Sequence, residues 1–103
     1  MGREDVKITT QTLKVLGAIV SCPQDEVSGA EIARVTKLAS GTLYPILLRL
    51  EQARWLESRW EVGDPHVMGR PRRRLYRISA SGACRARAVF REVESTIGGL
   101  AWN

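Results

Sequence analysis

The residues best suited to chemistry in this chain are arginines, which are concentrated in its second half. Residues 70–91 contain no aspartate or glutamate. A one-sided basic segment is the electrostatic footprint of a nucleic-acid binder, and it is also compatible with a solubilising surface. The net charge of +5 favours a polyanionic partner. The arginines of the segment are Arg70, Arg72, Arg73, Arg74, Arg77, Arg85, Arg87 and Arg91.

A second group of polar residues lies in the stretch "ASGTLYPILLRLEQARW", residues 39–55. Its apolar residues follow the i, i+3, i+4, i+7 spacing of a helix with one buried face, so we predict a helix over about 40–53. The inward residues are Leu43, Ile46, Leu47 and Leu50. The other side carries Gly41, Thr42, Tyr44, Arg49 and Gln52.

The start of this helix has the residue types that contact a nucleic acid. Gly41 would let the helix N-terminus approach a phosphate backbone closely. Thr42 would bond a phosphate or touch a thymine methyl, and Tyr44 would bond a phosphate or stack on a sugar. Tyr44 has the alternative of packing, half-buried, on the preceding helix. Ser40 is expected at the groove edge or as the N-cap, and Pro45 is tolerated if the helix begins near Thr42.

Further cations are expected near these residues. Lys37, in the turn before the helix, is a candidate phosphate contact. Arg49 faces outward, to contact DNA or to pair with Glu31 or Glu51. The candidate DNA contacts of the hairpin are Arg70, Arg72, Arg73 and Arg74. Because alternation sends them to both faces of the strand, Arg70 and Arg72 near the loop tip are the more favoured contacts. We expect Arg77 to support the fold, and Arg85, Arg87 and Arg91 to be solvated.

The elements that must position these residues begin with two short helices. The first is predicted over residues 10–21, with Leu13, Leu16, Ile19 and Val20 inward, and it ends because Pro23 disfavours helix at Cys22. The second opens at Ser28, where Ser28 and Glu31 form a capping box, with Ile32 and Val35 inward. Together with the helix over 40–53 they form a helix-turn-helix arrangement.

The spacing of the apolar residues then changes to the alternation of β-strands, which predicts a hairpin. In "WLESRWEV", residues 55–62, Leu56, Ser58, Trp60 and Val62 alternate inward, which places Trp60 in the core. Residues 63–72 form a loop, and "RRLYRIS" is a second strand with Tyr76 and Ile78 inward. The predicted fold is therefore mainly α with a small β-hairpin: a winged helix-turn-helix over residues 1–78, followed by a C-terminal dimerisation helix and tail over residues 79–103.

That last helix starts near Ser79 or Ser81 and ends at Gly98 and Gly99. Its apolar residues have the spacing of a coiled-coil seam, which packs either on its own domain or on a second copy of the chain. We expect a homodimer, since a small core needs extra burial. Trp102, beyond the glycines, either belongs to a disordered tail or would stack on a flat aromatic effector. The expected dimer contacts are Leu13, Leu16, Ala86, Val89, Phe90, Val93 and Ile97.

Other kinds of site are not indicated. No acid pair, nucleophile–base pair or phosphate-binding loop is present, so we predict neither an enzyme nor a cofactor. His66, Cys22 and Cys84 lack the spacing of metal ligands, and both thiols are expected to be small core residues. With no secretory pattern or membrane span, reduced thiols indicate the cytoplasm.

The segments "SGTLYPILLRLEQARWLESRWE" and "GRPRRRLYRISASG" closely resemble the PadR family of bacterial transcriptional regulators. The resemblance implies a repressor that is homodimeric through its terminal helices and binds an inverted-repeat operator in double-stranded DNA. Some relatives release DNA on binding a small aromatic molecule. The family usually has glycine after the recognition helix, where this chain has Arg54 and Trp55. Because a left-handed cap is harder for arginine, the helix is predicted to end differently.

Two other interpretations remain open. A winged-helix domain also serves as a protein–protein interaction module, although such a module needs no basic wing. A nucleic-acid-binding protein without sequence preference would show the same arginines, and it would bind specific and scrambled duplexes equally.

Overall fold

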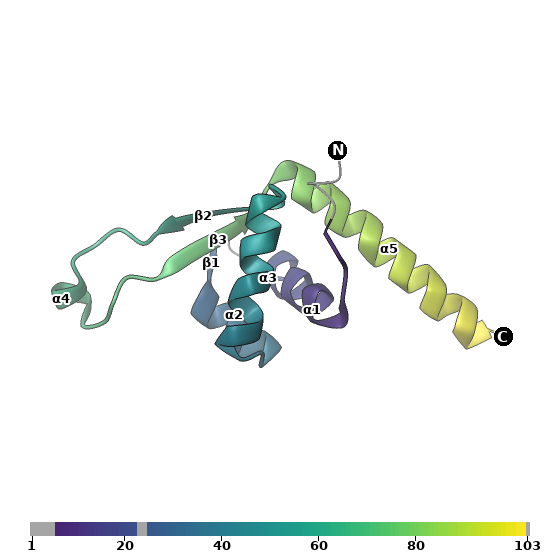
Figure 1. Cartoon of the computed structure of the whole chain (residues 1–103), viewed down its shortest axis with the longest axis horizontal. Coiled ribbons are helices and arrows are strands. Elements are labelled where there is room, and N and C mark those ends of the chain that lie inside the picture. The colour runs from purple at the N-terminus through teal and green to yellow at the C-terminus, as the bar shows by residue number, and fades with distance from the viewer. Residues whose placement is uncertain (1–5, 23–24, 103) are drawn as a thin grey trace.

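Three helices pack around one apolar core in the computed structural model, which describes residues 6–22 and 25–102, with side chains up to residue 97. They are α1 (Thr10–Val20), α2 (Gly29–Thr36) and α3 (Ser40–Gln52), and α3 lies across the front of the other two in Figure 1. The inward residues of α3 are buried as its spacing predicts. The core includes Val15, Leu16, Ile19, Ile32, Leu43, Ile46, Leu47, Leu50, Trp55 and Leu56.

Side-chain caps set where the first two helices begin. Thr9 Oγ1 accepts a hydrogen bond from the Thr12 amide at 3.1 Å, and Ser28 Oγ accepts one from the Glu31 amide at the same distance. The predicted capping box is only half formed, because the Glu31 carboxylate accepts from the Arg34 guanidinium. α2 then ends at Lys37, whose left-handed backbone (φ 62°) turns the chain toward α3.

The hairpin belongs to a three-stranded antiparallel sheet. Its strands are β1 (Val27–Ser28), β2 (Leu56–Trp60) and β3 (Arg74–Ile78), in the order β1-β3-β2. The loop between β2 and β3 contains a single helical turn, α4 (Pro65–Met68). Figure 1 shows the hairpin extending away from the helices with α4 at its tip. The mainly α fold with a small hairpin is therefore confirmed, with β1 and α4 added.

The last helix, α5 (Ala80–Trp102), leaves the domain on the side opposite the hairpin (Figure 1). Ser79 is its N-cap and accepts a hydrogen bond from the Gly82 amide at 2.9 Å. The predicted stop at Gly98 and Gly99 is wrong, since the helix runs on to Trp102. Two glycines cost a helix only about 2 kcal/mol, which does not by itself end it. The side chain of Trp102 lies outside the described part.

The start of α5 is seated on the junction between α3 and β2. Ser79 Oγ donates to the Arg54 carbonyl at 2.7 Å, and the Ser79 amide donates to the Trp55 carbonyl at 2.9 Å. A Cβ on Gly82 would lie 2.2 Å from the Trp55 oxygen. The different helix end predicted for Arg54 is wrong: this arginine adopts the left-handed conformation itself (φ 68°).

Several residues predicted to be inward are exposed. Val20 and Val35 lie one residue beyond the buried faces of their helices, which are centred on Leu16 and Ile32. Trp60 and Val62 lie where the hairpin has left the helices, so no second layer covers them. Cys84 is also exposed, on α5.

Two predicted dimer contacts are enclosed by the chain itself. Leu16 and Ala86 both have 0 % exposure in the single chain, so neither has surface to offer a second copy. Val89 and Phe90 pack partly on the domain core, whereas Ile97 is 60 % exposed. The outer half of α5 therefore carries the unpaired part of the seam.

Candidate nucleic-acid interface

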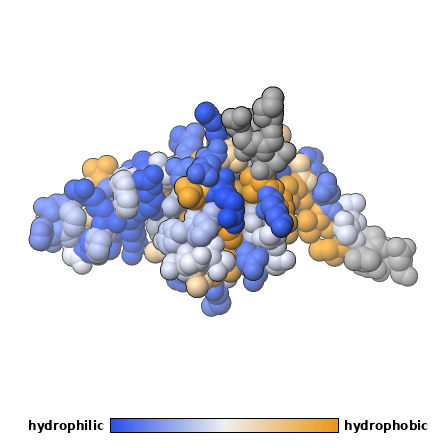
Figure 2. All heavy atoms as spheres, in the orientation of Figure 1, coloured by the Kyte–Doolittle hydropathy of each residue, from blue (hydrophilic) through white to orange (hydrophobic). Residues whose placement is uncertain are grey.

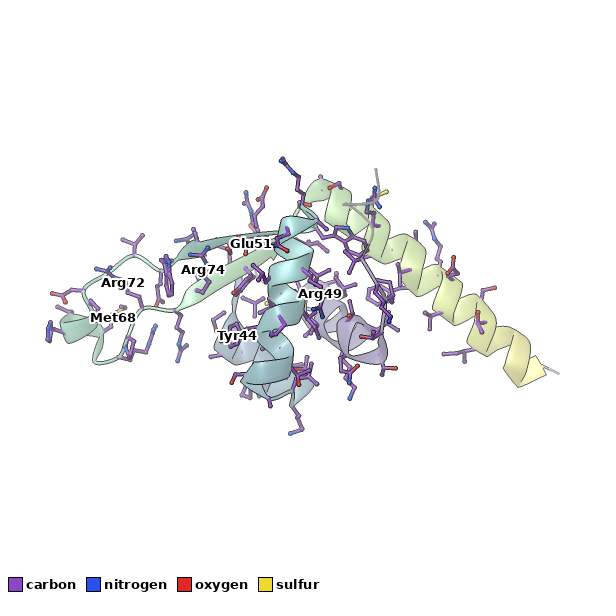
Figure 3. The ribbon with its side chains drawn as sticks, viewed as in Figure 1. Tyr44, Arg49, Glu51, Met68, Arg72 and Arg74 are labelled. Atoms are coloured by element: carbon purple, nitrogen blue, oxygen red, sulfur yellow. The ribbon has the colours of Figure 1, made fainter. Side chains whose placement is uncertain are left out.

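The outward face of α3 is defined by the position of its buried residues. Residues on the opposite side of the helix follow one another at i, i+4, i+7 and i+11, and all are exposed. They are Gly41, Pro45, Leu48 and Gln52. Thr42 and Arg49 lie along one edge of this line, and Tyr44 and Glu51 along the other. Figure 3 shows Arg49 on the side of α3 that faces α1, away from Tyr44.

The N-terminus of α3 is open to solvent. Its N-cap is Ala39, which provides no side-chain hydrogen bond, so the alternative of Ser40 as the cap is wrong. Because the helix begins at Ser40 rather than near Thr42, Pro45 lies inside it and cannot donate to the Gly41 carbonyl. A Cβ on Gly41 would meet nothing within 4 Å. The chain itself therefore gives no packing reason for glycine at this position.

Tyr44 is held in place by a glycine of the neighbouring helix. A Cβ on Gly29 would lie 2.8 Å from Tyr44 Oη, so the ring rests on the first residue of α2. The side chain nevertheless remains 43 % exposed. The ring thus packs on α2 along one edge and presents the other outward. The role of Gly29 in seating the ring could not be found from sequence, because it depends on the crossing of two helices.

Glu61 braces the wing, which we define as residues 61–73. Its carboxylate accepts hydrogen bonds from Arg70 Nη1 at 2.7 Å and Nη2 at 3.0 Å, and from the Arg73 amide at 3.2 Å. The bond from Arg70 is the main cause that lowers the pKa of Glu61 from 4.5 to about 2. Arg70, predicted to contact DNA, therefore has its guanidinium engaged inside the wing.

The side chains of the next three arginines along the chain make different contacts. Arg72 Nε donates to the Gly63 carbonyl at 2.6 Å. Arg73 is exposed, and its guanidinium makes no hydrogen bond or ion pair with any of the described residues. Arg74, the first residue of β3, donates from Nε to Ser58 Oγ at 3.1 Å and lies 5.1 Å from the centre of the Trp60 ring.

A network of hydrogen bonds links β3 to α3. Ser58 Oγ accepts from Arg74 and donates to Glu51 Oε2 at 2.6 Å, and Arg74 Nη2 lies 3.8 Å from the same oxygen. The labelled side chains of Glu51 and Arg74 extend from α3 and the hairpin in Figure 3. The network joins α3 to both strands of the hairpin, next to the point where the wing begins.

Between the hairpin and the first turns of α2 and α3 lies a groove of about 560 Å³. Exposed cations and aromatic rings line it, and Trp60, assigned to the core from its alternation, is 59 % exposed there. Figure 2 shows mostly hydrophilic residues over the hairpin end of the molecule. The lining residues are Gly29, Ala30, Tyr44, Trp60, Arg72, Arg73, Arg74 and Tyr76.

Three further arginines form ion pairs with glutamates of the same chain. Arg34 pairs with Glu31, Arg59 with Glu26, and Arg77 with Glu57, as expected if Arg77 supports the fold. The arginine partners lower the pKa of Glu26 and of Glu31.

Arg49 and Lys37 stay unpaired within the described part of the chain. The two glutamates considered for Arg49 are engaged elsewhere, Glu31 with Arg34 and Glu51 with Ser58. The Arg49 guanidinium has no hydrogen bond or ion pair with any described residue, and Lys37 is exposed in the turn before α3. Both side chains thus add unpaired positive charge to α3 and to the turn before it.

Two exposed side chains on this surface do not follow from the sequence patterns. Leu48 comes directly after Ile46 and Leu47, so the apolar spacing assigns it to neither face. Trp60 is predicted in the core because the alternation of β2 continues past the point where the core ends. A helical wheel centred on the buried residues of α3 would have placed Leu48 outside.

No cluster of metal-ligating side chains is found among residues 6–22 and 25–102. His66 is exposed on α4. In the same part of the chain no helix has the length and hydropathy that crossing a membrane requires.

Similar structures support the fold. A PadR-family transcriptional regulator from Eggerthella lenta is 23 % identical, with a TM-score of 0.70 over 89 % of this chain and 79 % of that one. Bordetella bronchiseptica BpsR, whose DNA binding is regulated by 6-hydroxynicotinic acid, is 18 % identical, with a TM-score of 0.72 over 92 % and 66 %. A cysteine-to-serine mutant of MarR from E. coli is 22 % identical, with a TM-score of 0.70 over 89 % and 62 %. The chain thus spans about two thirds of the length of BpsR and slightly less of MarR.

No curated protein matches the chain. The model of the transcriptional regulator PadR-like family matches residues 24–88, which is more than half of the sequence and includes α2, α3 and the whole hairpin. The matched segment holds both parts of the surface described above, the outward face of α3 and the wing. The winged-helix prediction is confirmed, and the chain belongs to the PadR-like family of transcriptional regulators.

Proposed function

We propose that the protein is a sequence-specific repressor that binds an inverted-repeat operator as a homodimer. α3 enters the major groove, and the wing lies on the phosphate backbone or in the minor groove. The observation that carries the proposal is the distribution of unpaired cations. Lys37 lies beside the open start of α3, Arg49 lies in its last turn and Arg73 lies on the wing. Most other arginines of the domain are engaged by carboxylates or carbonyls.

Each part of this surface suits one part of a duplex. The uncapped amides at the start of α3 and the open space at Gly41 favour a phosphate group there. Tyr44 presents its outer edge next to them. Arg72 and Arg73 lie along the groove that leads from α3 to the wing, where they would follow the backbone.

The dimer is proposed from α5. Its outer half carries Val93 and Ile97 beyond the reach of the domain core, and a helix with an unpaired apolar stripe is stabilised by a second copy. Residues 79–103 would thus act as the dimerisation segment. Two copies related by a two-fold axis would place their recognition helices one turn of DNA apart, roughly 34 Å.

Repression and effector release belong to the same proposal. A dimer bound over a promoter would block transcription in the cytoplasm. A flat aromatic molecule near Trp102, between the two terminal helices, would shift the spacing of the recognition helices and weaken operator binding. The behaviour of BpsR with 6-hydroxynicotinic acid supports the chemical class of effector, although that protein shares only 18 % identity with this chain.

The experiment is selection of bound duplexes from a random library, because it needs no knowledge of the operator. We expect an inverted repeat whose half-sites lie about one helical turn apart. Recovery of unrelated sequences would indicate binding through charge alone. Recovery of no DNA would favour the protein–protein interaction module instead.

A matched pair of variants tests the assignment of the surface. Arg73→Ala should lower the slope of log K against log salt by about 0.9 for each phosphate that the protein no longer neutralises. Arg91→Ala removes the same charge from an exposed position on α5 and should leave the slope unchanged. Equal effects of the two variants would contradict the proposed interface.

A further inference from the structure

Leu48 is an exposed leucine at the centre of the outward face of α3. Its side chain is 55 % exposed, while the core leucines and the core isoleucine of the same helix are at most 3 % exposed. It lies between Pro45 and Gln52 on the line opposite the buried residues. Packing within the chain therefore does not account for a large apolar side chain at this position.

The line of residues around Leu48 is short of hydrogen-bonding groups. Gly41 and Pro45 carry none, and Gln52, at the end of the helix, is the one amide side chain on the line. Arg49 and Tyr44 lie along its two edges. If this face meets the base edges, its middle presents an apolar surface, flanked by a cation on one side and a phenol on the other.

Only one base offers an apolar group to such a surface. In the major groove, guanine, cytosine and adenine present hydrogen-bond donors and acceptors, whereas thymine adds its C5-methyl group. A leucine in the middle of the groove-facing line would bury that methyl. The same side chain would leave the polar edge of a guanine or cytosine without a partner, which disfavours those bases.

A protein partner fits the surroundings of Leu48 less well. The guanidinium of Arg49 beside it has no carboxylate partner among the described residues, because Glu31 and Glu51 are engaged elsewhere. An apolar protein surface covering Leu48 would bury the unpaired charge of Arg49, which is costly. A polyanion with an apolar group in its groove matches both the charge and the leucine.

We propose that Leu48 determines sequence specificity by contacting the C5-methyl group of one thymine in each half-site. The inference rests on the proposed function, because it requires α3 in the major groove. It adds to that function the base that the centre of the helix recognises and the side chain that recognises it.

The test replaces single thymines by uracil in the duplex recovered by selection. Uracil lacks only the methyl group and keeps the base pair. We expect one thymine in each half-site whose replacement weakens binding of the wild-type protein about fourfold, the value for burying one methyl group. Leu48→Ala should bind the thymine and uracil duplexes equally, at the weaker level.

Val20→Ala is the matched control, since Val20 is an exposed apolar residue on α1, away from this face. It should keep the preference for thymine. Circular dichroism should show both variants to be folded, because both substitutions are at the surface. Binding of thymine and uracil duplexes with equal affinity by the wild type, or a preference retained by Leu48→Ala, would overturn the inference while specific binding itself would stand. If no duplex is recovered by selection, the proposed function fails as well.

Discussion

The space around Gly41 would accommodate a larger side chain. The residue is helical, and a Cβ there would touch nothing within 4 Å. Gly41→Ala should therefore stabilise the isolated protein by about 1 kcal/mol, the difference in helix propensity. In the proposed complex the added methyl would lie between α3 and a phosphate group, so affinity for DNA should fall roughly tenfold, about 1.4 kcal/mol.

Gly17→Ala is the matched control for that substitution. Gly17 lies within α1, and a Cβ there also meets nothing within 4 Å. It should raise the thermal midpoint by a similar amount and leave DNA affinity unchanged. A Gly41→Ala protein that binds DNA as tightly as the wild type would show that no close approach occurs at this position.

Individual residues were the hardest part of the surface to predict from sequence. The spacing of α3 correctly separated its buried face from Gly41, Thr42 and Tyr44. It could not show that Arg70 is neutralised, because the partner, Glu61, lies across a loop of several residues. Charge near a wing is visible in a sequence, but the pairing of that charge depends on how the loop folds back.

At the scale of elements, the wing depends on the ionised form of Glu61. The folded pKa of about 2 is below the ordinary 4.5, so the carboxylate stabilises the wing fully above pH 4.5. This stabilisation is lost as the pH falls from 4.5 through about 2. A carbon NMR titration of the Glu61 carboxyl should give a midpoint near 2 in the wild type.

Two substitutions separate the cause of that shift. Arg70→Ala should raise the pKa of Glu61 toward 4.5, because the hydrogen bond from Arg70 is its largest cause. Arg72→Ala removes an adjacent arginine that donates to a carbonyl instead, so it should leave the midpoint low. A midpoint near 4.5 in the wild-type protein would show that Arg70 does not hold the Glu61 carboxylate in its ionised form.

The seat of α5 on the domain gives a second prediction at this scale. Gly82→Ala would place a methyl 2.2 Å from the Trp55 carbonyl oxygen, with further Trp55 backbone atoms within 2.8 Å. Because these atoms belong to the backbone and cannot rotate away, the free energy of unfolding should fall by about 1–3 kcal/mol. Urea unfolding measures the change, and a Gly82→Ala protein as stable as the wild type would show that α5 is not seated there.

The three helices of the domain could be predicted from sequence, whereas the two shortest elements, β1 and α4, were not predicted. Apolar periodicity and capping residues placed α1, α2 and α3 to within a residue or two. β1 has two residues, too few to show a period, and it exists only because β3 pairs with it. α4 had detectable signals: Asp64 as the N-cap, Pro65 in the first turn and Gly69 in the left-handed cap.

At the scale of the molecule, the hairpin and α5 project in opposite directions from the helical domain, with α3 between them (Figure 1). The described chain measures 57 × 31 × 25 Å along its principal axes. Much of α5 thus lies beyond the helical domain. Dimerisation itself stays a prediction.

The outer half of α5 supplies the test of that prediction. The wild-type protein should sediment as a dimer, whereas the double variant Val93→Asp, Ile97→Asp should be a monomer, because two carboxylates would enter the apolar seam. Phe90 is left unchanged, since it packs partly on the domain core. Ser95→Asp adds a charge on the same helix outside the seam and should remain dimeric. A wild-type monomer would contradict the proposed assembly.

The central claim, specific binding of DNA by a dimer, is tested most directly by fluorescence anisotropy of labelled DNA. The duplex would come from the region upstream of the protein's own gene, and it would be titrated beside a scrambled duplex at one moderate salt concentration. The account predicts saturable binding to the upstream duplex at two chains per duplex, with affinity at least about 10³-fold above the scrambled one. Equal affinity for the two duplexes, or binding to neither, would contradict it.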